Sequence, residues 1–147
     1  MYIFYYPTKD ATVYSGSTPG KLSSTDVSTM NTGLDEILEI DKWIPDDGTF
    51  PLVDVNSVSR AFIQFDYTAL SSSVADGTIT NPTYSLKLFS TETTTEIPLS
   101  YTLKAFPLSQ SWEMGDGTYH DDPQTTEGVS WRYRDGANVG TFWTGSI

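Results

Sequence analysis

The chain has 147 residues and is 37% hydrophobic, which is enough for one core, so we expect a single domain over residues 1–147. Its 19 acidic and 8 basic residues give a formal net charge of -11, which makes nucleic acid an unfavourable partner. The absence of cysteine excludes disulfides and thiolate metal sites. No apolar run approaches the roughly 20 residues of a membrane-spanning helix, and the first residues lack a secretion-signal pattern, so no membrane contact is expected.

The beginning of the chain predicts short strands joined by loops. Residues 1–6 form an aromatic-rich extended segment that ends at Pro7, whose missing amide donor suits the end of a strand. Asp10–Tyr14 alternates between two faces and predicts a strand. Residues 15–33 are rich in Ser, Thr, Gly and Pro and have almost no apolar periodicity, which predicts a loop on the surface.

Residues 34–40 fit two patterns. Leu34, Ile37 and Leu38 have helical spacing, whereas Leu38 and Ile40 have strand spacing. We predict a strand, because the segment is short and lies between loop-forming stretches that would have to cap a helix at both ends. Residues 43–56 contain two prolines and an Asp-Asp-Gly sequence, which predicts a turn.

The strongest strand signal covers Ser59–Tyr67, around which the rest of the chain is expected to be organised. Its residues alternate between an apolar side and a partly polar side, and the polar members indicate that the second face is only partly covered. The first side comprises Ala61, Ile63, Phe65 and Tyr67, and the second comprises Arg60, Phe62, Gln64 and Asp66.

Two further strands are predicted in the middle of the chain. Residues 68–82 are polar and turn-like, with the clearest turn at Asp76-Gly77. Residues 83–90 and 97–107 both alternate and are expected to form an antiparallel hairpin around a turn at 91–95. Because no segment combines helix length with helix period, we predict an all-β fold, an antiparallel β-sandwich of jelly-roll type with long loops. The side chains expected to point inward from the first strand of this hairpin are Tyr84, Leu86 and Leu88.

Residues 109–136 differ in composition from the rest of the chain. They concentrate Trp, Gly, Asp and the single His, and three of the four tryptophans lie beyond residue 110. A buried aromatic side chain covers about 150–250 Å², which is enough to anchor a long loop. We therefore predict an ordered loop that is held on the sheet by Trp112 and Trp131.

Two sets of short motifs follow one another along nearly the whole chain. The first set resembles the opening of DNRLRE-type β-sandwich domains, which are disaggregatase-related modules similar to carbohydrate-binding modules. It comprises Pro7–Val13, Asn31–Gly33, Glu36–Ile40 and Ser59–Asp66. The second set resembles a group of tailed-phage virion structural proteins built on the same sandwich. It comprises Ser111–Gly117, Asp122-Pro123, Gly128–Trp131 and Arg134-Asp135.

The resemblance implies how the domain is completed and where it acts. In the domains it resembles, further strands follow the tryptophan-rich loop. We therefore expect that residues 1–147 are the N-terminal part of a longer domain or protein, or that a partner strand completes the sandwich. The resemblance also implies a place in the virion, assembled in the host cytoplasm, with other virion proteins as partners in an oligomeric assembly.

Acidic side chains in two places are candidate metal ligands. Asp116, Asp121 and Asp122 lie beside His120, and carboxylate oxygens suit hard divalent cations. A solvated acidic loop is the favoured interpretation, because no known ligand spacing is present. Some of the sandwich modules that the chain resembles carry structural calcium, for which Asp10 and the loop of Asn31 are the corresponding candidates here. No other cofactor is implied.

Enzyme activity is disfavoured. Glu113 and the neighbouring aspartates supply acids, but catalysis needs a nucleophile with a base, or two opposed carboxylates in a cleft. None of the sequence motifs that carry such arrangements is present. We therefore predict no catalytic residues.

Aromatic residues of the C-terminal third are the candidate binding residues. Their rings could stack on a sugar or contact a protein, while the alternative interpretation is that they pack the loop on its own sheet. Arg60 is expected to pair with Asp66 or Asp135 and so hold the loop, rather than to bind a ligand. The candidate residues are Trp112, Tyr119, Trp131, Tyr133 and Trp143.

The sequence therefore predicts a structural role on the tail, baseplate or capsid exterior of a tailed phage, through contacts with neighbouring subunits. The alternative is a carbohydrate-binding module, including a receptor-binding one on the same particle. The acidic surface would keep the subunit soluble before assembly.

Overall fold

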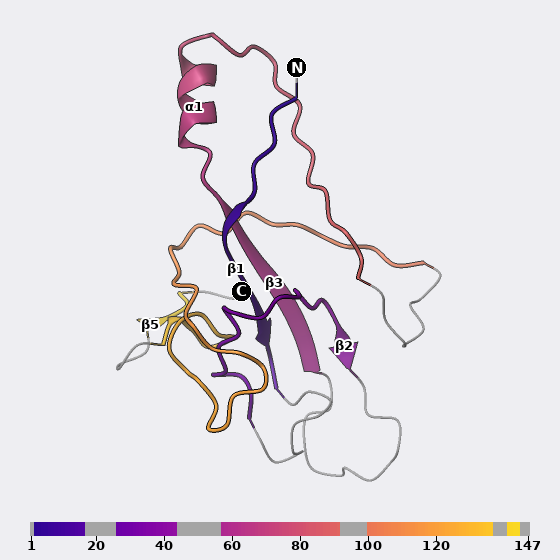
Figure 1. Ribbon diagram of the computed structural model, residues 1–147, viewed down its shortest axis with the longest axis vertical. Helices are drawn as coiled ribbons and strands as arrows, with labels where there is room; N and C mark the ends of the chain where they lie inside the picture. Colours follow the sequence, from indigo (N-terminus) through magenta and orange to yellow (C-terminus); the bar gives the residue numbers. More distant parts are fainter. Residues whose placement is uncertain (1, 17–25, 44–56, 92–99, 137–140, 145–147) are drawn as a thin grey trace. The chain divides into compact units, whose positions relative to one another are not determined.

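The computed structural model describes residues 2–16, 26–43, 57–91, 100–136 and 141–144 (Figure 1). These residues divide into two compact units, the first formed by Met1–Phe65 with Gln110–Ile147 and the second by Asp66–Ser109. Within the described ranges, strands form one three-stranded and one two-stranded antiparallel sheet, beside a single short helix. The all-β class predicted from the sequence is therefore confirmed. No helix in these ranges is long and apolar enough to cross a membrane.

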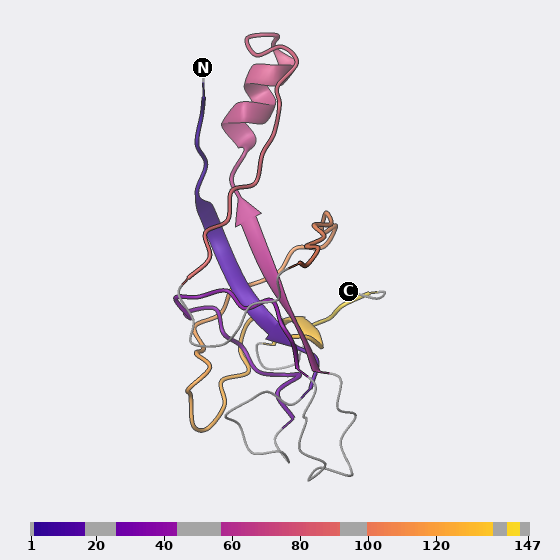
Figure 2. The ribbon, with the colours of Figure 1, turned by 90° about the vertical axis from the view of Figure 1, so that its right-hand side faces the viewer.

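The first unit is built on a ribbon of two long strands, which run side by side in both views (Figures 1 and 2). β1, Pro7–Tyr14, pairs antiparallel with β3, Ser57–Phe65, and β2, Lys42–Trp43, pairs with the start of β3. The strand order is β1-β3-β2. Both long strands were predicted from their alternation. β1 begins three residues earlier than expected, and β3 ends at Phe65 rather than at Tyr67.

One face of the β1–β3 ribbon holds the principal hydrophobic cluster. Ala11 lies opposite Phe62 and Val13 lies opposite Arg60, so these four side chains share a face. Ala11 and Val13 are buried there, with Phe62 packed against them. The partly polar side of β3 is therefore the side that faces this cluster. We had expected it to be the less covered one.

The opposite face is covered by a segment that the sequence placed on the surface. Tyr14 clusters with Val27 and Met30, both of which are completely or almost completely buried. Thr32 donates its hydroxyl to the carbonyl of Thr12 at 2.7 Å and accepts the amide of Thr12 at 3.2 Å. Most of residues 27–32 thus belong to the core, and the prediction of a surface loop is wrong for this part of residues 15–33. Residues 17–25 lie outside the described ranges.

Residues 34–40 form turns and irregular chain, so the predicted strand is wrong. The amide of Leu34 donates to the carbonyl of Gly117 at 2.9 Å, and the amide of Glu39 donates to the hydroxyl of Thr12 at 2.9 Å. In a β-strand, such N–H groups would donate to the carbonyls of a neighbouring strand. Here they donate to a loop carbonyl and to a side-chain hydroxyl instead. A few apolar residues with strand spacing do not override this arrangement.

A small hairpin near the C-terminus was not predicted. β4, Tyr133–Asp135, pairs with β5, Thr141–Phe142. Tyr133 lies opposite Phe142, with ring centroids 4.8 Å apart. The sequence signal was weak because each strand is only two or three residues long.

The second unit contains a helix where a polar turn was predicted. α1, Thr68–Ala75, has no buried residue. The carboxylate of Asp66 accepts the amide of Thr68 at 3.0 Å, and hydrogen bonding by Thr68 lowers the pKa of Asp66. The prediction failed because the polar composition of residues 68–82 suggested a turn, whereas the Ser72 and Ser73 hydroxyls bond to carbonyls one helical turn earlier. The predicted Asp76-Gly77 turn is confirmed, with Gly77 at φ 80.

The predicted hairpin of residues 83–90 and 97–107 is not formed in the described ranges. Residues 83–90 and 100–107 carry no strand, and the inward-facing prediction for Tyr84, Leu86 and Leu88 is wrong. These side chains are 69%, 54% and 51% exposed. Alternation predicts which residues share a face, but a face is buried only when another layer covers it. Some of these predictions lie outside the described ranges, namely residues 97–99 and most of the turns at 43–56 and 91–95. At the N-terminus, residues 2–6 are exposed and form no strand.

Candidate functional site

The tryptophan-rich loop, residues 109–136, is attached to the β1–β3 ribbon through Trp112. This side chain is only 5% exposed and packs with Ala11, Val13 and Val129 in the principal cluster. Phe62 of β3 lies beside it, with ring centroids 5.9 Å apart. The predicted anchoring role of Trp112 is therefore confirmed. A buried ring in this position is not available to an external ligand.

Trp131 makes the second predicted attachment, but through a different contact. The guanidinium carbon of Arg60 lies 4.7 Å from the centroid of the Trp131 ring, in a cation–π arrangement. Arg60 thus helps to hold the loop by stacking, whereas we had predicted a carboxylate partner. The described hydrogen bond of Asp66 goes to Thr68. The pairing of Arg60 with Asp135, which lies in β4, stays a prediction.

The stacking of Arg60 can be tested with a charge-removing substitution. Arg60→Met keeps an apolar stem over Trp131, and we expect it to lower the free energy of unfolding by about 1–2 kcal/mol. Urea unfolding followed by tryptophan fluorescence measures this change. Lys87→Met is a matched control, because Lys87 lies 4.7 Å from the centroid of Phe89, whose ring is exposed. We expect the control to change stability by less than about 0.5 kcal/mol. Equal effects of the two variants would contradict the assignment.

Three further aromatic residues of the C-terminal third also contact the protein itself. Trp143 packs edge-on against Phe62, with centroids 5.3 Å apart, and its indole nitrogen donates to the carbonyl of Ser130 at 3.0 Å. Tyr133 packs against Phe142, and the Phe142 ring is 62% exposed. Tyr119 packs edge-on against Tyr14 on the other face of the ribbon. The structure therefore uses the predicted binding aromatics for internal packing and leaves Phe142 as the exposed ring beside them.

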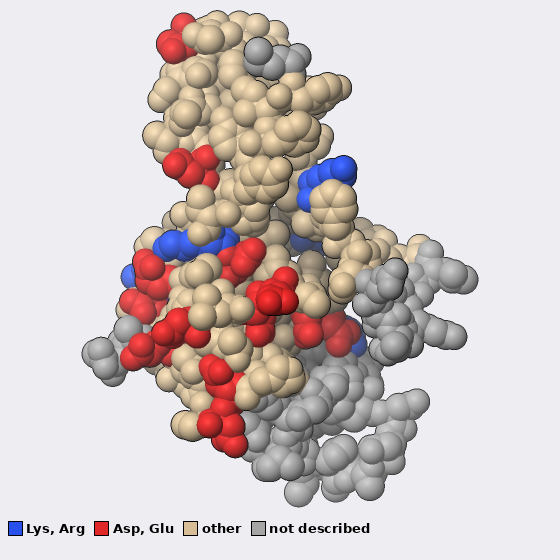
Figure 3. Space-filling view, in the orientation of Figure 1, with Lys and Arg blue, Asp and Glu red and all other residues tan. Residues whose placement is uncertain are grey.

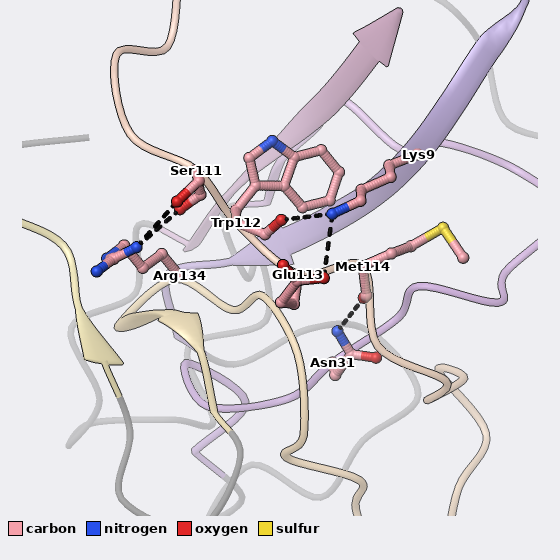
Figure 4. A network of polar contacts seen from close by, with 7 residues as sticks. All are labelled: Lys9, Asn31, Ser111, Trp112, Glu113, Met114 and Arg134. Carbon is pink, nitrogen blue, oxygen red and sulfur yellow. Dashed lines mark hydrogen bonds and ion pairs between the residues drawn. The ribbon is translucent and has the colours of Figure 1, made fainter. Parts of the chain in front are cut away.

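Polar contacts fix the backbone on both sides of Trp112 (Figure 4). The Lys9 ammonium donates to the carbonyl of Trp112 and to the carboxylate of Glu113, both at 3.0 Å. Arg134 donates to the carbonyl of Ser111 at 3.1 Å and to its hydroxyl at 3.2 Å. The Lys9 contacts join the loop to β1, and the Arg134 contacts join the beginning of the loop to β4 near its end. Glu113, a candidate acid in the sequence, acts here as an ion-pair partner.

Asn31 is the polar centre of the site. Its side chain is completely buried, and its amide nitrogen donates to the carbonyls of Met114 at 2.7 Å and Val129 at 2.9 Å. Its amide oxygen accepts the backbone N–H groups of Gly33 at 3.2 Å and Gly117 at 2.8 Å. Both donors and both acceptor positions of the amide are therefore used. This one side chain crosslinks the buried segment 26–33 to two separate parts of the tryptophan-rich loop.

Three glycines let the loop backbone approach Asn31 closely. A Cβ atom at Gly115 would lie 2.4 Å from the Asn31 amide oxygen, and one at Gly128 would lie 2.7 Å from the Asn31 amide nitrogen. A Cβ atom at Gly117 would lie 2.5 Å from the Asn31 carbonyl oxygen. Each distance is shorter than a Cβ contact allows, so larger residues would push the loop away from Asn31. We call Asn31 with Gly115, Gly117 and Gly128 the asparagine hub.

The candidate metal ligands do not form a cluster in the described ranges. No group of three His, Cys, Asp or Glu side chains within those ranges is placed to hold an ion. Asp121 accepts hydrogen bonds from the hydroxyls of Thr118 at 2.7 Å and Thr125 at 2.6 Å. The Asn31 oxygen is occupied by two amides, which corrects our view of it as a calcium ligand. Asp10 lies in β1 opposite Ile63. The remaining candidates, Asp116, His120 and Asp122, are exposed.

A second cluster holds the other side of segment 26–33. The hydroxyl of the buried Tyr14 donates to the carboxylate of Glu39 at 2.7 Å. Burial, together with the Glu39 carboxylate, raises the pKa of Tyr14 well above its usual value. At the edge of this segment Arg132 forms an ion pair with Asp26 at 2.8 Å. Burial opposes ionisation of Asp26, but hydrogen bonding by Ser28 and the charge of Arg132 outweigh it, so the pKa of Asp26 is lowered.

The raised pKa of Tyr14 predicts loss of stability at alkaline pH. The unfolded chain releases the tyrosine proton near pH 10, whereas the folded chain keeps it, so the free energy of unfolding falls as the pH rises above about 10. Urea unfolding at a series of pH values measures this slope. We expect Tyr14→Phe to flatten it, and Tyr101→Phe, at an exposed position, to leave it unchanged. An identical alkaline slope in Tyr14→Phe would exclude Tyr14 as its source.

The sequence did not indicate the importance of segment 26–33. Its buried members include Ser28, Asn31 and Thr32, which are polar and give no hydrophobic periodicity. Besides the Asn31–Gly33 motif of the resemblance, the available signal was the set of glycines in the distant loop, because glycine is needed where backbone passes close to another group.

Comparison with protein-family models, with curated proteins and with solved structures finds no match for this chain. The function therefore has to be argued from the geometry and from the sequence motifs. In the described part of the site, the aromatic and polar side chains are largely engaged in fixing the loop.

Proposed function

We propose that the chain is a structural subunit of a tailed-phage virion, on the tail, baseplate or capsid exterior, and that it acts through contacts with neighbouring protein subunits. The observation that carries this proposal is the amount of apolar surface left uncovered. In the described ranges, 19 large hydrophobic side chains are exposed, whereas seven hydrophobic residues are buried. Large uncovered apolar surfaces are typical of protein interaction sites. The order of the virion-protein motifs supports the placement on a phage.

The proposed architecture is a β-sandwich of jelly-roll type. The β1–β3 ribbon with β2 would form part of one layer. The alternating segments 83–90 and 97–107 are further candidates for strands. Support comes from their composition, because Tyr, Leu and Phe alternate with Ser, Thr and Lys as in strands with one covered face. The described apolar side chains of these segments are exposed, so a sandwich would need further residues to cover them.

The charge distribution fits a subunit that must stay soluble before assembly. Acidic side chains gather on the visible face of the first unit, whereas few basic ones lie among them (Figure 3). A net charge of -11 opposes both early association and contact with packaged nucleic acid. On assembly, the apolar segments would supply most of the binding free energy, and the charges would influence which partners are accepted.

The test is cross-linking and mass spectrometry on purified particles that contain the chain. An amine-reactive reagent should link Lys87 and Lys104, which lie in the exposed apolar segments, to other virion proteins or to further copies of the chain. Absence of the chain from the particles would overturn the virion proposal. A glycan array measures the alternative function. Binding that is lost in Phe142→Ala, with folding retained, would favour a carbohydrate-binding module instead.

A further inference from the structure

Residues 141–144, which include β5, are attached to the first unit mainly through one aromatic ring. The Trp143 ring is partly buried and packs edge-on against Phe62, with ring centroids 5.3 Å apart. Its indole nitrogen donates to the carbonyl of Ser130 at 3.0 Å. The ring beside it in the chain, that of Phe142, is 62% exposed. Trp143 is therefore the principal anchor of this segment.

The side chain of Gln110 holds the end of the segment as a neighbouring strand would. Its amide nitrogen donates to the carbonyl of Thr144 at 3.0 Å, and its amide oxygen accepts the backbone amide of Thr144 at 3.2 Å. The Thr144 hydroxyl donates to the same oxygen at 2.9 Å. One backbone donor and one backbone acceptor are thus paired, as in an antiparallel ladder. Because two of the three contacts go to backbone, Gln110 recognises an extended chain as well as a particular side chain.

The groups that hold the segment are fixed by contacts of their own. The amide of Ser130 donates to the carbonyl of Tyr133 at 2.8 Å, and the amide of Tyr133 donates to the Ser130 hydroxyl at 3.1 Å. Phe62 lies in the paired strand β3 and packs against the principal cluster, whose buried residues do not include Trp143. We call Phe62, Gln110 and the Ser130 carbonyl the acceptor surface, and we expect it to persist when the segment leaves.

The remaining attachments of the segment are weak. β5 has two residues, and its pairing with β4 is irregular. The amide of Trp143 lies 3.5 Å from the carbonyl of Arg132, which is long for a hydrogen bond. A short, exposed strand with such contacts opens at a lower free-energy cost than the core does. Residues 141–144 are also uncharged, so the net charge of -11 does not oppose a similar segment that arrives from outside.

We propose that the acceptor surface is a peptide-binding site. Residues 141–144 occupy it in the isolated chain, and an extended, uncharged segment of a neighbouring protein displaces them by adding beside β4. A tryptophan of that segment takes the position of Trp143 against Phe62, because a large ring supplies most of the contact area. Gln110 pairs with the backbone of the residue that follows. This inference rests on the proposed contacts with neighbouring subunits and gives one of them a location.

A peptide with the sequence of residues 140–145, blocked at both ends, tests the site in the unsubstituted chain. NMR follows the indole N–H signals of the isotope-labelled chain while unlabelled peptide is added. At peptide concentrations on the order of 1–10 mM, comparable with the effective concentration of the tethered segment, the Trp143 signal should move to the position of a solvent-exposed indole. The Trp112 signal should change little. An unmoved Trp143 signal, or an equal effect of a control peptide with Ala in place of Trp, would overturn the proposal.

Substitutions on both sides of the contact give an independent measure. We expect the peptide to bind Trp143→Ala at least about tenfold more tightly than the unsubstituted chain, because competition from the tethered segment is reduced. Adding Gln110→Ala should weaken this binding about tenfold, since the paired amide is lost. Gln124→Ala, which removes a hydrogen bond to Thr29 outside the acceptor surface, is the matched control and should leave the affinity unchanged. Equal effects of the two glutamine substitutions, or a Trp143→Ala variant that is folded by circular dichroism but does not bind, would contradict the proposal.

Peptide binding and presence in particles are separate measurements. If the chain is present in particles but does not bind the peptide, only this inference is overturned. If the chain binds the peptide but is absent from particles, the virion proposal is overturned and the peptide-binding site stands.

Discussion

Replacing Asn31 with aspartate should lower the free energy of unfolding by about 3–5 kcal/mol at neutral pH, although the side chain keeps its size. The substitution removes the two N–H donors that bind the carbonyls of Met114 and Val129. It places a second oxygen against those carbonyls and introduces a charge at a completely buried position. Urea unfolding followed by tryptophan fluorescence measures the loss.

Asn81→Asp is the matched control for this substitution. Asn81 is exposed in a turn with φ 52, a conformation that asparagine and aspartate both adopt. We expect the control to change stability by less than about 0.5 kcal/mol. Lower pH should partly restore the Asn31→Asp variant, because a protonated carboxyl regains one donor. A loss below about 1 kcal/mol at neutral pH would show that Asn31 is not a buried crosslink.

Gly115→Ala should also cost about 3–5 kcal/mol, because two separate effects add. Gly115 has φ 78, where a side chain is strained, and its Cβ atom would lie 2.4 Å from the Asn31 amide oxygen and 2.5 Å from the carbonyl of Glu127. Overpacking at this point forces the loop away from Asn31. The expected signs are a lower thermal midpoint and partial exposure of Trp112 to quenchers.

Gly77→Ala separates the backbone effect from the steric one. Gly77 has nearly the same backbone angle, φ 80, but nothing lies within 4 Å of a Cβ atom placed there. The control therefore suffers only the conformational strain, which we expect to cost about 1 kcal/mol. Similar losses in both variants would indicate that close approach to Asn31 is unimportant.

Two of the elements defined by alternation were predicted well from the sequence. β1 and β3 alternate over enough residues to be recognised, and the bulky Trp112 was correctly predicted as the anchor of a long loop. Both signals are local or depend on one large side chain. The nature of the Arg60 contact was missed, because a cation can pair with a ring as well as with a carboxylate, and the sequence does not distinguish these partners.

Elements held by specific polar contacts were not predicted. Segment 26–33 has the composition of a surface loop, yet Asn31 is completely buried because all of its hydrogen-bonding capacity is satisfied. α1 was mistaken for a turn because its serines favour turns by composition. The apolar side chains of residues 83–90 have a recognisable face, but sequence alternation does not specify what covers that face.

The two units of the chain differ in how well their apolar side chains are covered. The first unit is fixed by a buried cluster on one face of the β1–β3 ribbon, a second cluster on the other face, and the asparagine hub. The second unit carries an exposed helix and exposed apolar segments. In the virion role that we propose, the uncovered apolar segments would be covered when the subunit meets its neighbours during assembly.

Hydrogen exchange of the Asn31 side-chain amide, followed by NMR, tests the central claim most directly. If Asn31 crosslinks segment 26–33 to the tryptophan-rich loop, its two amide protons should exchange with solvent at least about 100-fold more slowly than those of the exposed Asn81, because exchange would require opening of the hub. They should also show contacts to the α-protons of Gly115 and Gly128. Exchange of the Asn31 protons as fast as that of Asn81 would contradict the account.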